Sequence, residues 1–329
     1  MARFLPRIRS LFYHNPVLVL FLAVFAAFGI LSPRFADPHN LTNILIQSSS
    51  AAIVATGMTY VLLTAGIDLS VGSIMFVTAA VAGKMILSGW PLWACVLTVA
   101  LVGFLYGGVN AFCIARLRMI PFMVTLATLY LGRGLALWIS ETRAMNLPES
   151  LLRVGTARLF GWIPAPALIA AGVVAAAHLV LTRTMFGRQV YAVGYSPDIA
   201  TKAGINTNGI VARVYLITAL CAVVGGIVSV AQLGAVSPTF GSQREFAAIA
   251  ASVLGGTSLF GGRGAVFPGT VLGALLIQMV ENGLVIVHAD PYIYPMITAS
   301  IIFFAVLLDC LRQRRVARLS GRRIRTRLD

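Results

Sequence analysis

A few ionisable side chains interrupt long apolar stretches of the sequence, and they are the first candidates for chemistry. Asp68 lies between two apolar runs, with Gly66 before it and Ser70 and Gly72 after it. If these runs cross a membrane, a carboxylate at that depth is a candidate functional residue. Asp68 has two compatible interpretations. Its side chain caps the start of the next helix by accepting from free backbone amides, or it contacts a passing solute.

Arg133 lies between two glycines inside another apolar run, so it must face a polar partner, a cavity or the protein interior instead of lipid. The simplest role is a structural ion pair, with Glu141, Glu245 or Glu281 as the candidate partner. Other polar groups within apolar runs either line a hydrophilic path or hydrogen-bond between helices; they are Asn110, Gln278, Glu281 and Asn282.

The remaining reactive residue types do not form a catalytic or metal-binding pattern. The four cysteines and four histidines are scattered singly, without metal-ligand spacing or a disulfide framework. No phosphate-binding G-x-x-x-x-G-K-[ST] motif occurs, since Gly83-Lys84 lacks the upstream glycine. We therefore expect no catalytic residue, no metal site, no cofactor and no nucleotide hydrolysis in this chain.

Composition places these residues in a membrane protein. Of 329 residues, 59% are hydrophobic and 11% are charged, and the mean hydropathy is +0.90. Soluble domains are about 45–50% apolar and about 25% charged. Ten apolar segments are long enough to be candidate spans of about 20 residues each; they are 17–32, 43–65, 71–88, 92–115, 121–140, 164–182, 214–235, 245–260, 265–287 and 292–310. The predicted fold is an all-α, polytopic helical bundle.

The distribution of positive charge predicts how the bundle is oriented. With residue 1 inside the cell, 18 of the 25 Lys and Arg lie on the inner side, six lie outside and Arg133 lies within a span. Removing the weakest span, 245–260, would place the arginine-rich C-terminal tail outside. We therefore expect both termini to be cytoplasmic. The chain would then consist of an N-terminal segment 1–16, a single transmembrane domain 17–310 and a basic tail 311–329. The segment 17–32 lacks a convincing signal-peptidase site, which favours an uncleaved first span.

The net charge of +15 could also suggest a nucleic-acid-binding protein. However, the basic residues lie next to the spans and mostly on one predicted side, without interleaved aromatic residues. Topology and anionic membrane lipid explain them, and nucleic acid is not an expected partner.

Two glycine-rich breaks interrupt the apolar pattern on the same predicted side of the membrane. The first is 64–73, around Asp68 and Ser70. The second is 254–264, which contains Gly255, Gly256 and Ser258. Irregular backbone at membrane depth requires surrounding protein or water, and broken helices in two halves indicate a transport pathway. These residues are candidates for a helix break or a translocation path.

A short polar island within the connector 183–213 predicts an exposed helix. Ser196 is placed to cap it, Pro197 occupies its first position, and Gly204 follows its end. Asp198 and Lys202 suit its positive and negative ends and could pair on its surface. The helix 197–203 would lie on the membrane surface, where Ile199 could contact a soluble partner.

Together these motifs resemble the permeases of ribose-type sugar ABC importers. The resemblance covers about 40–310, in order and at the usual spacing. It is carried by four segments: MTYVLLTAGIDLSVG (58–72), IPFMVTL (120–126) with Arg133-Gly134, AASVLGGTSL (250–259) with Gly262-Arg263-Gly264, and the connector 187–206.

The resemblance implies a permease subunit in a bacterial inner membrane, with a second identical or homologous permease completing the path. A separate cytoplasmic subunit would bind ATP and Mg²⁺, and a periplasmic sugar-binding protein would deliver a monosaccharide. In that family the island is the coupling helix, so Ser196, Pro197, Asp198, Ile199, Lys202 and Gly204 would dock on the ATPase.

Two alternatives from other classes remain open at this point. A stand-alone channel or ion-coupled secondary transporter would use Asp68 or Glu281 as an ion or proton site and would not need a coupling helix. A membrane-embedded enzyme is the second alternative, although the sequence contains no paired carboxylates or activated nucleophile that would support it.

Overall fold

The computed structural model describes residues 16–159, 161–294, 296–301, 303–304, 306–307 and 310. The predicted terminal segments 1–16 and 311–329 lie outside the described residues, apart from Pro16. The helices are α2 (Pro16–Leu31), η1 (Pro33–Ala36), α3 (Pro38–Leu63), α4 (Val71–Leu87), α5 (Leu92–Ala111), η2 (Phe112–Arg116), α6 (Pro121–Ser140), α7 (Glu149–Thr156), α8 (Ala165–Arg183), α9 (Met185–Tyr195), α10 (Pro197–Lys202), α11 (Thr207–Leu233), α12 (Arg244–Leu254), η3 (Val266–Thr270), α13 (Val271–Ile286) and η4 (Pro291–Ile293).

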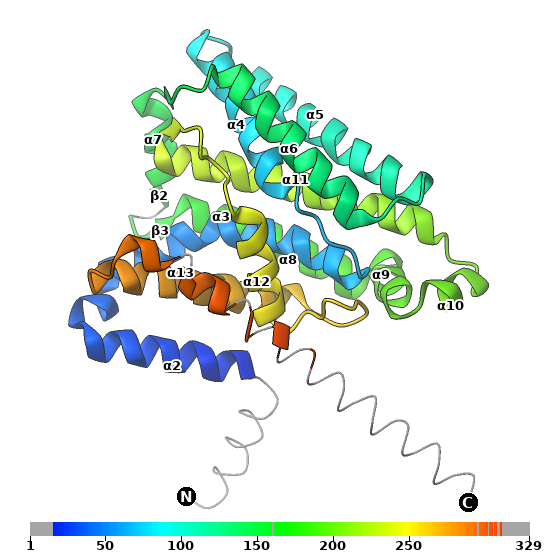
Figure 1. The fold of residues 1–329 in the computed structure, drawn as a ribbon. Helices are drawn as coiled ribbons and strands as arrows, with labels where there is room; N and C mark the ends of the chain where they lie inside the picture. Colours follow the sequence, from blue (N-terminus) through cyan, green and yellow to red (C-terminus); the bar gives the residue numbers. More distant parts are fainter. Residues whose placement is uncertain are drawn as a thin grey trace, which may run out of the picture.

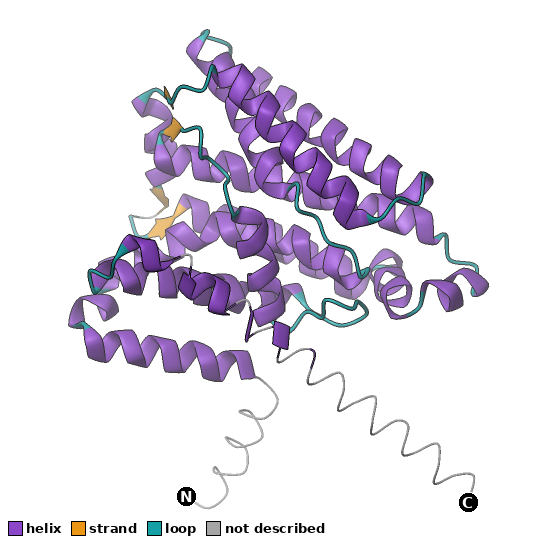
Figure 2. Ribbon diagram, in the orientation of Figure 1, coloured by secondary structure: helices purple, strands orange, loops and turns teal. Residues whose placement is uncertain are grey.

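The strands are four two-residue segments that form two antiparallel pairs. β1 (Met145–Asn146) pairs antiparallel with β4 (Ala235–Val236), and β2 (Arg158–Leu159) pairs with β3 (Ile163–Pro164). These strands and α7 lie at one end of the bundle, whereas α9 and α10 lie at the other end (Figures 1 and 2). The all-α prediction is therefore confirmed, with the short strands confined to loops at one end of the bundle.

Within the described residues, six helices are long and apolar enough to cross a membrane. They are Pro38–Leu63, Leu92–Arg116, Pro121–Ser140, Ala165–Arg183, Thr207–Leu233 and Val266–Ile286, and Val17–Leu31 and Val71–Leu87 are shorter apolar helices. The chain is therefore a polytopic helical membrane protein. The described residues contain fewer candidate spans than the ten that the sequence predicts.

The predicted span 245–260 is wrong as a continuous helix. Its helix, α12, has 11 residues and ends before Gly255, so it is about 16 Å long and too short for a hydrocarbon core of about 30 Å. Glycines cause this ending: Gly256, Gly261 and Gly262 all have positive φ, which residues with a Cβ rarely adopt. In Figure 1, α12 lies at the centre of the bundle, where it contacts α3 and α13 on one side and α4 on the other.

The first break also enters the bundle. Ser73, in the first turn of α4, packs against Gly132, and the Ser73 hydroxyl lies 3.0 Å from the Tyr106 hydroxyl. Gly132 is near the middle of α6, so α4 begins about half-way along that helix. The residues between α3 and α4 therefore return from the end of α3 into the interior of the bundle.

Small residues allow the central helices to approach closely. A Cβ at Gly103 would overlap Val223 and one at Gly107 would crowd Ala219, so α5 packs tightly on α11. A second pair with the same spacing, Gly269 and Gly273, lies against the backbone of α12 and of Gly255, the residue that follows it. Glycines four residues apart allow such close approach of helices.

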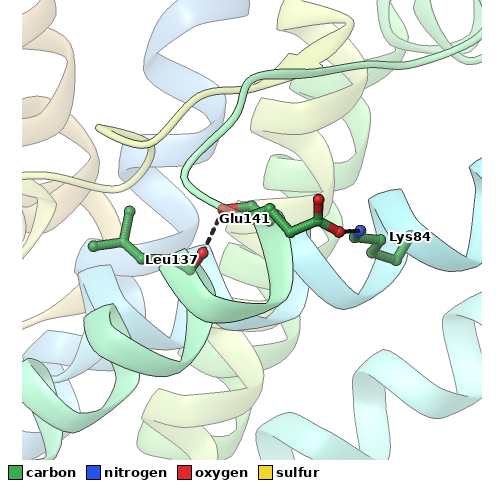
Figure 3. Close-up of polar contacts among 4 residues, drawn as sticks. Lys84, Leu137 and Glu141 are labelled. Atoms are coloured by element: carbon green, nitrogen blue, oxygen red, sulfur yellow. Dashed lines mark hydrogen bonds and ion pairs between the residues drawn. The ribbon is translucent and has the colours of Figure 1, made fainter.

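An ion pair joins the C-terminal ends of α4 and α6. Lys84 of α4 donates to the Glu141 carboxylate at 2.7 Å, and Glu141 follows the last residue of α6 (Figure 3). The backbone N–H of Glu141 donates to the Leu137 carbonyl, which closes the end of α6. The predicted topology places Lys84 and Glu141 on the same, outer side.

Candidate functional site

Three chain segments meet at the end of the bundle that carries α10. The Gly262 N–H of the second break donates to the Leu63 carbonyl, the last residue of α3, at 2.9 Å. A Cβ at Gly194 of α9 would overlap the same carbonyl, so the backbones are in direct contact. We call Leu63, Gly194 and Gly262 the inner junction. Through it the connector that bears α10 touches the second break and the residue immediately before the first break.

A tyrosine reinforces the inner junction. The Tyr191 hydroxyl of α9 donates to the Gly264 carbonyl at 2.7 Å. Burial raises the pKa of the Tyr191 phenol, so it remains a neutral donor at physiological pH. The second break is therefore tied to α9 by both side-chain and backbone contacts.

The predicted short helix is confirmed as α10. The Ser196 hydroxyl accepts from the Ile199 N–H at 3.4 Å, Pro197 is the first helical residue, and Gly204 has φ +81° beyond the end. Ala200 is buried, whereas 63% of Ile199 is exposed. The predicted ion pair of Asp198 with Lys202 is not formed: the ion pairs among the described residues are Lys84–Glu141 and Glu149–Arg153.

A cavity of about 410 Å³ lies beside α10. It is lined by Tyr191, Tyr195, Ile199, Ala200, Ile205 and Gly262, among others. The exposed edge of α10 and this cavity together form a concave apolar surface next to the inner junction. Such a surface can receive an apolar side chain from another protein.

Asp68 lies at the start of α4, in a buried hydrogen-bond chain. Its Oδ1 accepts from the Ser70 N–H at 2.8 Å and from the Ser70 hydroxyl at 2.6 Å. Asn110 then donates to the Ser70 hydroxyl at 2.8 Å, and the Thr128 hydroxyl donates to Asn110 at 2.9 Å. Three predicted site residues are thus brought together, and the chain joins α4, α5 and α6.

The capping interpretation of Asp68 needs one adjustment. Its carboxylate does not bond amides within α4; it bonds the amide of Ser70, the residue immediately before the helix. It therefore fixes the backbone that leads into α4. Asp68 is fully buried, and its Oδ2 has no hydrogen-bond partner among the described residues.

The expected ion pair of Arg133 is not formed in the structure. Arg133 donates to the Phe240 carbonyl at 3.4 Å, and its Nη2 has no partner among the described residues. Glu141 instead pairs with Lys84. Of the predicted partners, Glu245 is the one that interacts electrostatically with Arg133. Its buried Oε2 also lacks a hydrogen bond among the described residues. The two charges lie near each other without direct contact.

Polar pairs join α3 to α13 along their length. Asn40 and Asn282 exchange two amide hydrogen bonds, at 2.9 and 3.0 Å. Gln278 donates to Gln47 at 2.8 Å. Near the other end of the contact, the Thr59 hydroxyl lies 2.7 Å from the hydroxyl of Thr270, the last residue of η3 before α13. The helix-to-helix interpretation of Gln278 and Asn282 is therefore confirmed.

The same two residues also face a second, larger cavity. It has a volume of about 950 Å³ and lies between α3, the start of α12, α13 and the described helical residues after Tyr294. Its polar lining comprises Gln47, Ser242, Gln243, Arg244, Gln278, Glu281, Asn282 and Thr298. The cavity therefore gathers Gln278, Glu281 and Asn282, the three predicted residues of α13.

The predicted residues of the second break lie elsewhere. Gly255 packs against the backbone of Gly269, and Gly256 has φ +92°. Ser258 N–H donates to the Arg263 carbonyl at 2.9 Å, and the Ser258 hydroxyl accepts from Phe260 at 3.2 Å. These three residues shape a turn against α13 and do not line the 950 Å³ cavity.

Sequence reasoning missed Gln47, Arg244 and Gly194. Gln47 and Arg244 are single polar residues near the ends of expected spans, where such residues are common. Gly194 has ordinary helical backbone within α9, so only its contact with Leu63 reveals its role. Within the described residues, no group of three or more His, Cys, Asp or Glu could hold a metal ion.

Comparison with known proteins gives consistent matches over most of the chain. Residues 40–309 match the family described as the permease component of the branched-chain amino acid transport system. The chain is 38% identical to the ribose import permease protein of Escherichia coli K12 over 304 residues, covering 90% of this chain and 93% of that protein. No solved structure matches at a significant level.

Two further relatives have similar coverage. Identity is 35% with the D-allose transport system permease protein of Escherichia coli K12, over 92% of this chain and 93% of that protein. Identity is 33% with the fructose import permease protein of Rhizobium meliloti, over 89% of this chain and 84% of that protein.

Proposed function

Because this chain belongs to the family of branched-chain amino acid transport system permease components, we propose that it is the membrane-spanning subunit of an ATP-driven monosaccharide importer. It is a multi-pass protein of the bacterial inner membrane and a transport subunit, not an enzyme. The similarity to ribose, allose and fructose permeases over about nine-tenths of the chain carries the proposal.

The substrate would be a monosaccharide delivered by a periplasmic binding protein. The relatives are named for three different simple sugars. The polar lining of the 950 Å³ cavity consists mainly of amides, hydroxyls and one residue of each charge. This mixture suits an uncharged polyol better than an ion, because neither sign of charge dominates it.

The energy would come from a separate ATP-binding subunit, which would hold ATP and Mg²⁺. We assign α10 to this contact, because Ile199 is exposed on a rigid, capped helix next to an apolar cavity. The inner junction ties this helix to both breaks, so a displacement of α10 would move the ends of α3 and α12.

The complete topology would have ten crossings, with both termini in the cytoplasm and residues 17–310 as a single domain. The strand β4 lies at the α7 end and the second break at the α10 end, so the chain between them traverses the bundle. The loop after β4 and the helix α12 together make this crossing. The number of crossings therefore stays even. A second permease, identical or homologous, would complete the path.

Purification of the tagged protein from its native membrane, followed by identification of its companions, tests this function. We expect an ATPase and a periplasmic sugar-binding protein, whose ligand would identify the substrate. Substitution of Ile199 by Asp should abolish ATP-dependent uptake and leave membrane insertion intact. Substitution of Ser237 by Asp, at the α7 end, is the matched control and should retain uptake.

The rival is a stand-alone ion-coupled transporter or channel that uses Asp68 or Glu281. A chain lacking residues 196–204 separates the two possibilities. Full uptake by this deletion variant, dependent on a proton gradient and independent of ATP, would support the rival and overturn the importer.

A further inference from the structure

The lining of the 950 Å³ cavity is of two chemical kinds. Gln47, Gln278 and Asn282 contribute amide groups, and Arg244 and Glu281 contribute opposite charges. The rest of the lining is largely aromatic or aliphatic, with Phe246, Val285, Tyr294, Phe303 and Val306. Phe246 is half exposed, so part of its ring is available for contact. The cavity therefore offers both polar and apolar contacts to a ligand.

Arg244 and Glu281 come from different helices and act on each other electrostatically. Arg244 begins α12, and Glu281 lies on α13 one turn from both Gln278 and Val285. They do not form an ion pair within 4 Å among the described residues. Ionisable groups in membrane segments face water or protein instead of lipid, so Glu281 faces the protein or water on this side of α13. Both groups retain hydrogen-bonding capacity for a ligand.

A sugar ring matches this arrangement. Its adjacent hydroxyl groups can each donate and accept, so they suit the planar, two-headed side chains of Arg, Glu and Gln. One face of the ring carries C–H groups, which pack favourably on an aromatic side chain. An ion would find no uniform charge here, and an apolar molecule would leave the side chains of Arg244 and Glu281 without hydrogen-bond partners.

We propose that this cavity binds one monosaccharide during its passage, with Arg244 and Glu281 holding adjacent ring hydroxyls and Phe246 packing against the C–H face. This inference rests on the proposed function and specifies its substrate site. At about 950 Å³, the cavity is at the upper end of the range of about 300–1,000 Å³ for small-molecule pockets. A single sugar leaves room for water, and the resulting weak binding permits release.

The test uses the complete importer reconstituted in liposomes, with D-ribose, D-allose and D-fructose as probes. Arg244→Gln and Glu281→Gln should each lower transport of the preferred sugar about tenfold, the loss expected for one hydrogen bond to a charged group. ATP hydrolysis stimulated by the binding protein should continue, because the inner junction is unchanged. The matched controls are Arg153→Gln and Glu149→Gln on exposed α7, which should transport at the wild-type rate.

A second measurement does not depend on transport. Ala247→Cys places a thiol on the cavity wall, and its reaction with a water-soluble maleimide, above the background of the wild-type chain, reports access to the cavity. The preferred sugar at millimolar concentration should slow this labelling at least twofold, whereas glycine betaine should not.

The possible failures are distinguishable. If the wild-type importer moves a sugar, but both cavity variants match it and no sugar slows labelling, the proposed binding site is wrong and the function stands. If the wild-type complex transports none of the three sugars with ATP, the monosaccharide function fails, and this inference fails with it.

Discussion

Glu245, in the first turn of α12, lies directly against Gly72, in the first turn of α4. A Cβ at Gly72 would overlap both the Glu245 carboxylate and the Gly241 carbonyl. The N-terminal ends of two helices therefore meet inside the bundle, and each end has its own carboxylate: Asp68 before α4 and Glu245 within α12. Carboxylates stabilise the partial positive charge of helix N-termini. Broken helices that meet in this way are typical of transport sites.

Gly72→Ala should separate the starts of α4 and α12. Gly72 has an ordinary helical backbone, so the penalty is steric: we expect about 1–3 kcal/mol of destabilisation from overpacking, together with reduced transport. Thermal unfolding of the purified protein and an uptake assay measure the two effects. Gly108→Ala in α5 is the matched control, because a Cβ there meets no atom within 4 Å. Equal unfolding temperatures for the two variants would contradict the contact.

Arg133 and Glu245 should be energetically coupled. Arg133→Leu removes the positive charge that acts on buried Glu245, so we expect impaired assembly or transport. Adding Glu245→Gln to the Arg133→Leu variant removes the carboxylate that has lost its compensating positive charge. This second substitution should restore part of the lost assembly or transport. A double-mutant cycle on unfolding stability should give a coupling of about 0.5–3 kcal/mol. Additive effects would show that the two side chains act independently.

Asp68→Ala should lower the folded yield more than it alters solute preference. It removes the acceptor for both the N–H and the hydroxyl of Ser70, and those groups are buried. Asp68→Asn keeps an oxygen in place of Oδ1 and should recover most of the yield. Yield is read from fluorescence-detected chromatography, and preference from competition among sugars. A normal yield with changed preference would assign Asp68 to the solute path instead.

Sequence pattern predicted most of the architecture because apolar length and turn chemistry are local properties. The Ser196-Pro197 start and Gly204 end of α10 are local signals, and the structure contains this helix as predicted. The span 245–260 was predicted too long because its apolar residues continue past Leu254. The glycines that end α12 are tolerated in membrane helices, so hydropathy alone does not reveal the ending.

The site was harder to predict because its contacts join distant segments. Asp68, Ser70 and Asn110 were selected separately, and only the fold shows that they form one hydrogen-bond chain. Arg133 was expected to form an ion pair, but burial next to Glu245 does not bring the two groups into contact. Partner choice among several carboxylates depends on helix packing, which a single sequence does not specify.

The Lys84–Glu141 pair should make stability depend on pH in one direction. The hydrogen bond from Lys84, followed by its charge, holds the pKa of Glu141 below its usual value of 4.5. The stabilisation is therefore present above the unfolded pKa and is lost as the pH falls through the lowered folded pKa. Thermal unfolding of wild type and Glu141→Gln should differ at pH 7 and converge in acid. The difference should also shrink in high salt, because the pair is exposed.

Gly194→Ala should break the link between α10 and the two breaks. Its Cβ would overlap the Leu63 carbonyl and crowd the Gly262 amide, and neither backbone group can rotate away as a side chain could. We expect the Gly262-to-Leu63 hydrogen bond to be lost, because the added methyl group lies against both of its partners. The proposed ATP-binding subunit would then still bind α10, but the motion of α10 would reach α3 and α12 weakly. Uptake per ATP hydrolysed should fall at least tenfold with normal membrane insertion, whereas Gly172→Ala in α8, where a Cβ meets no atom within 4 Å, should behave as wild type. Normal coupling in the Gly194 variant would show that α10 moves the helices by another route.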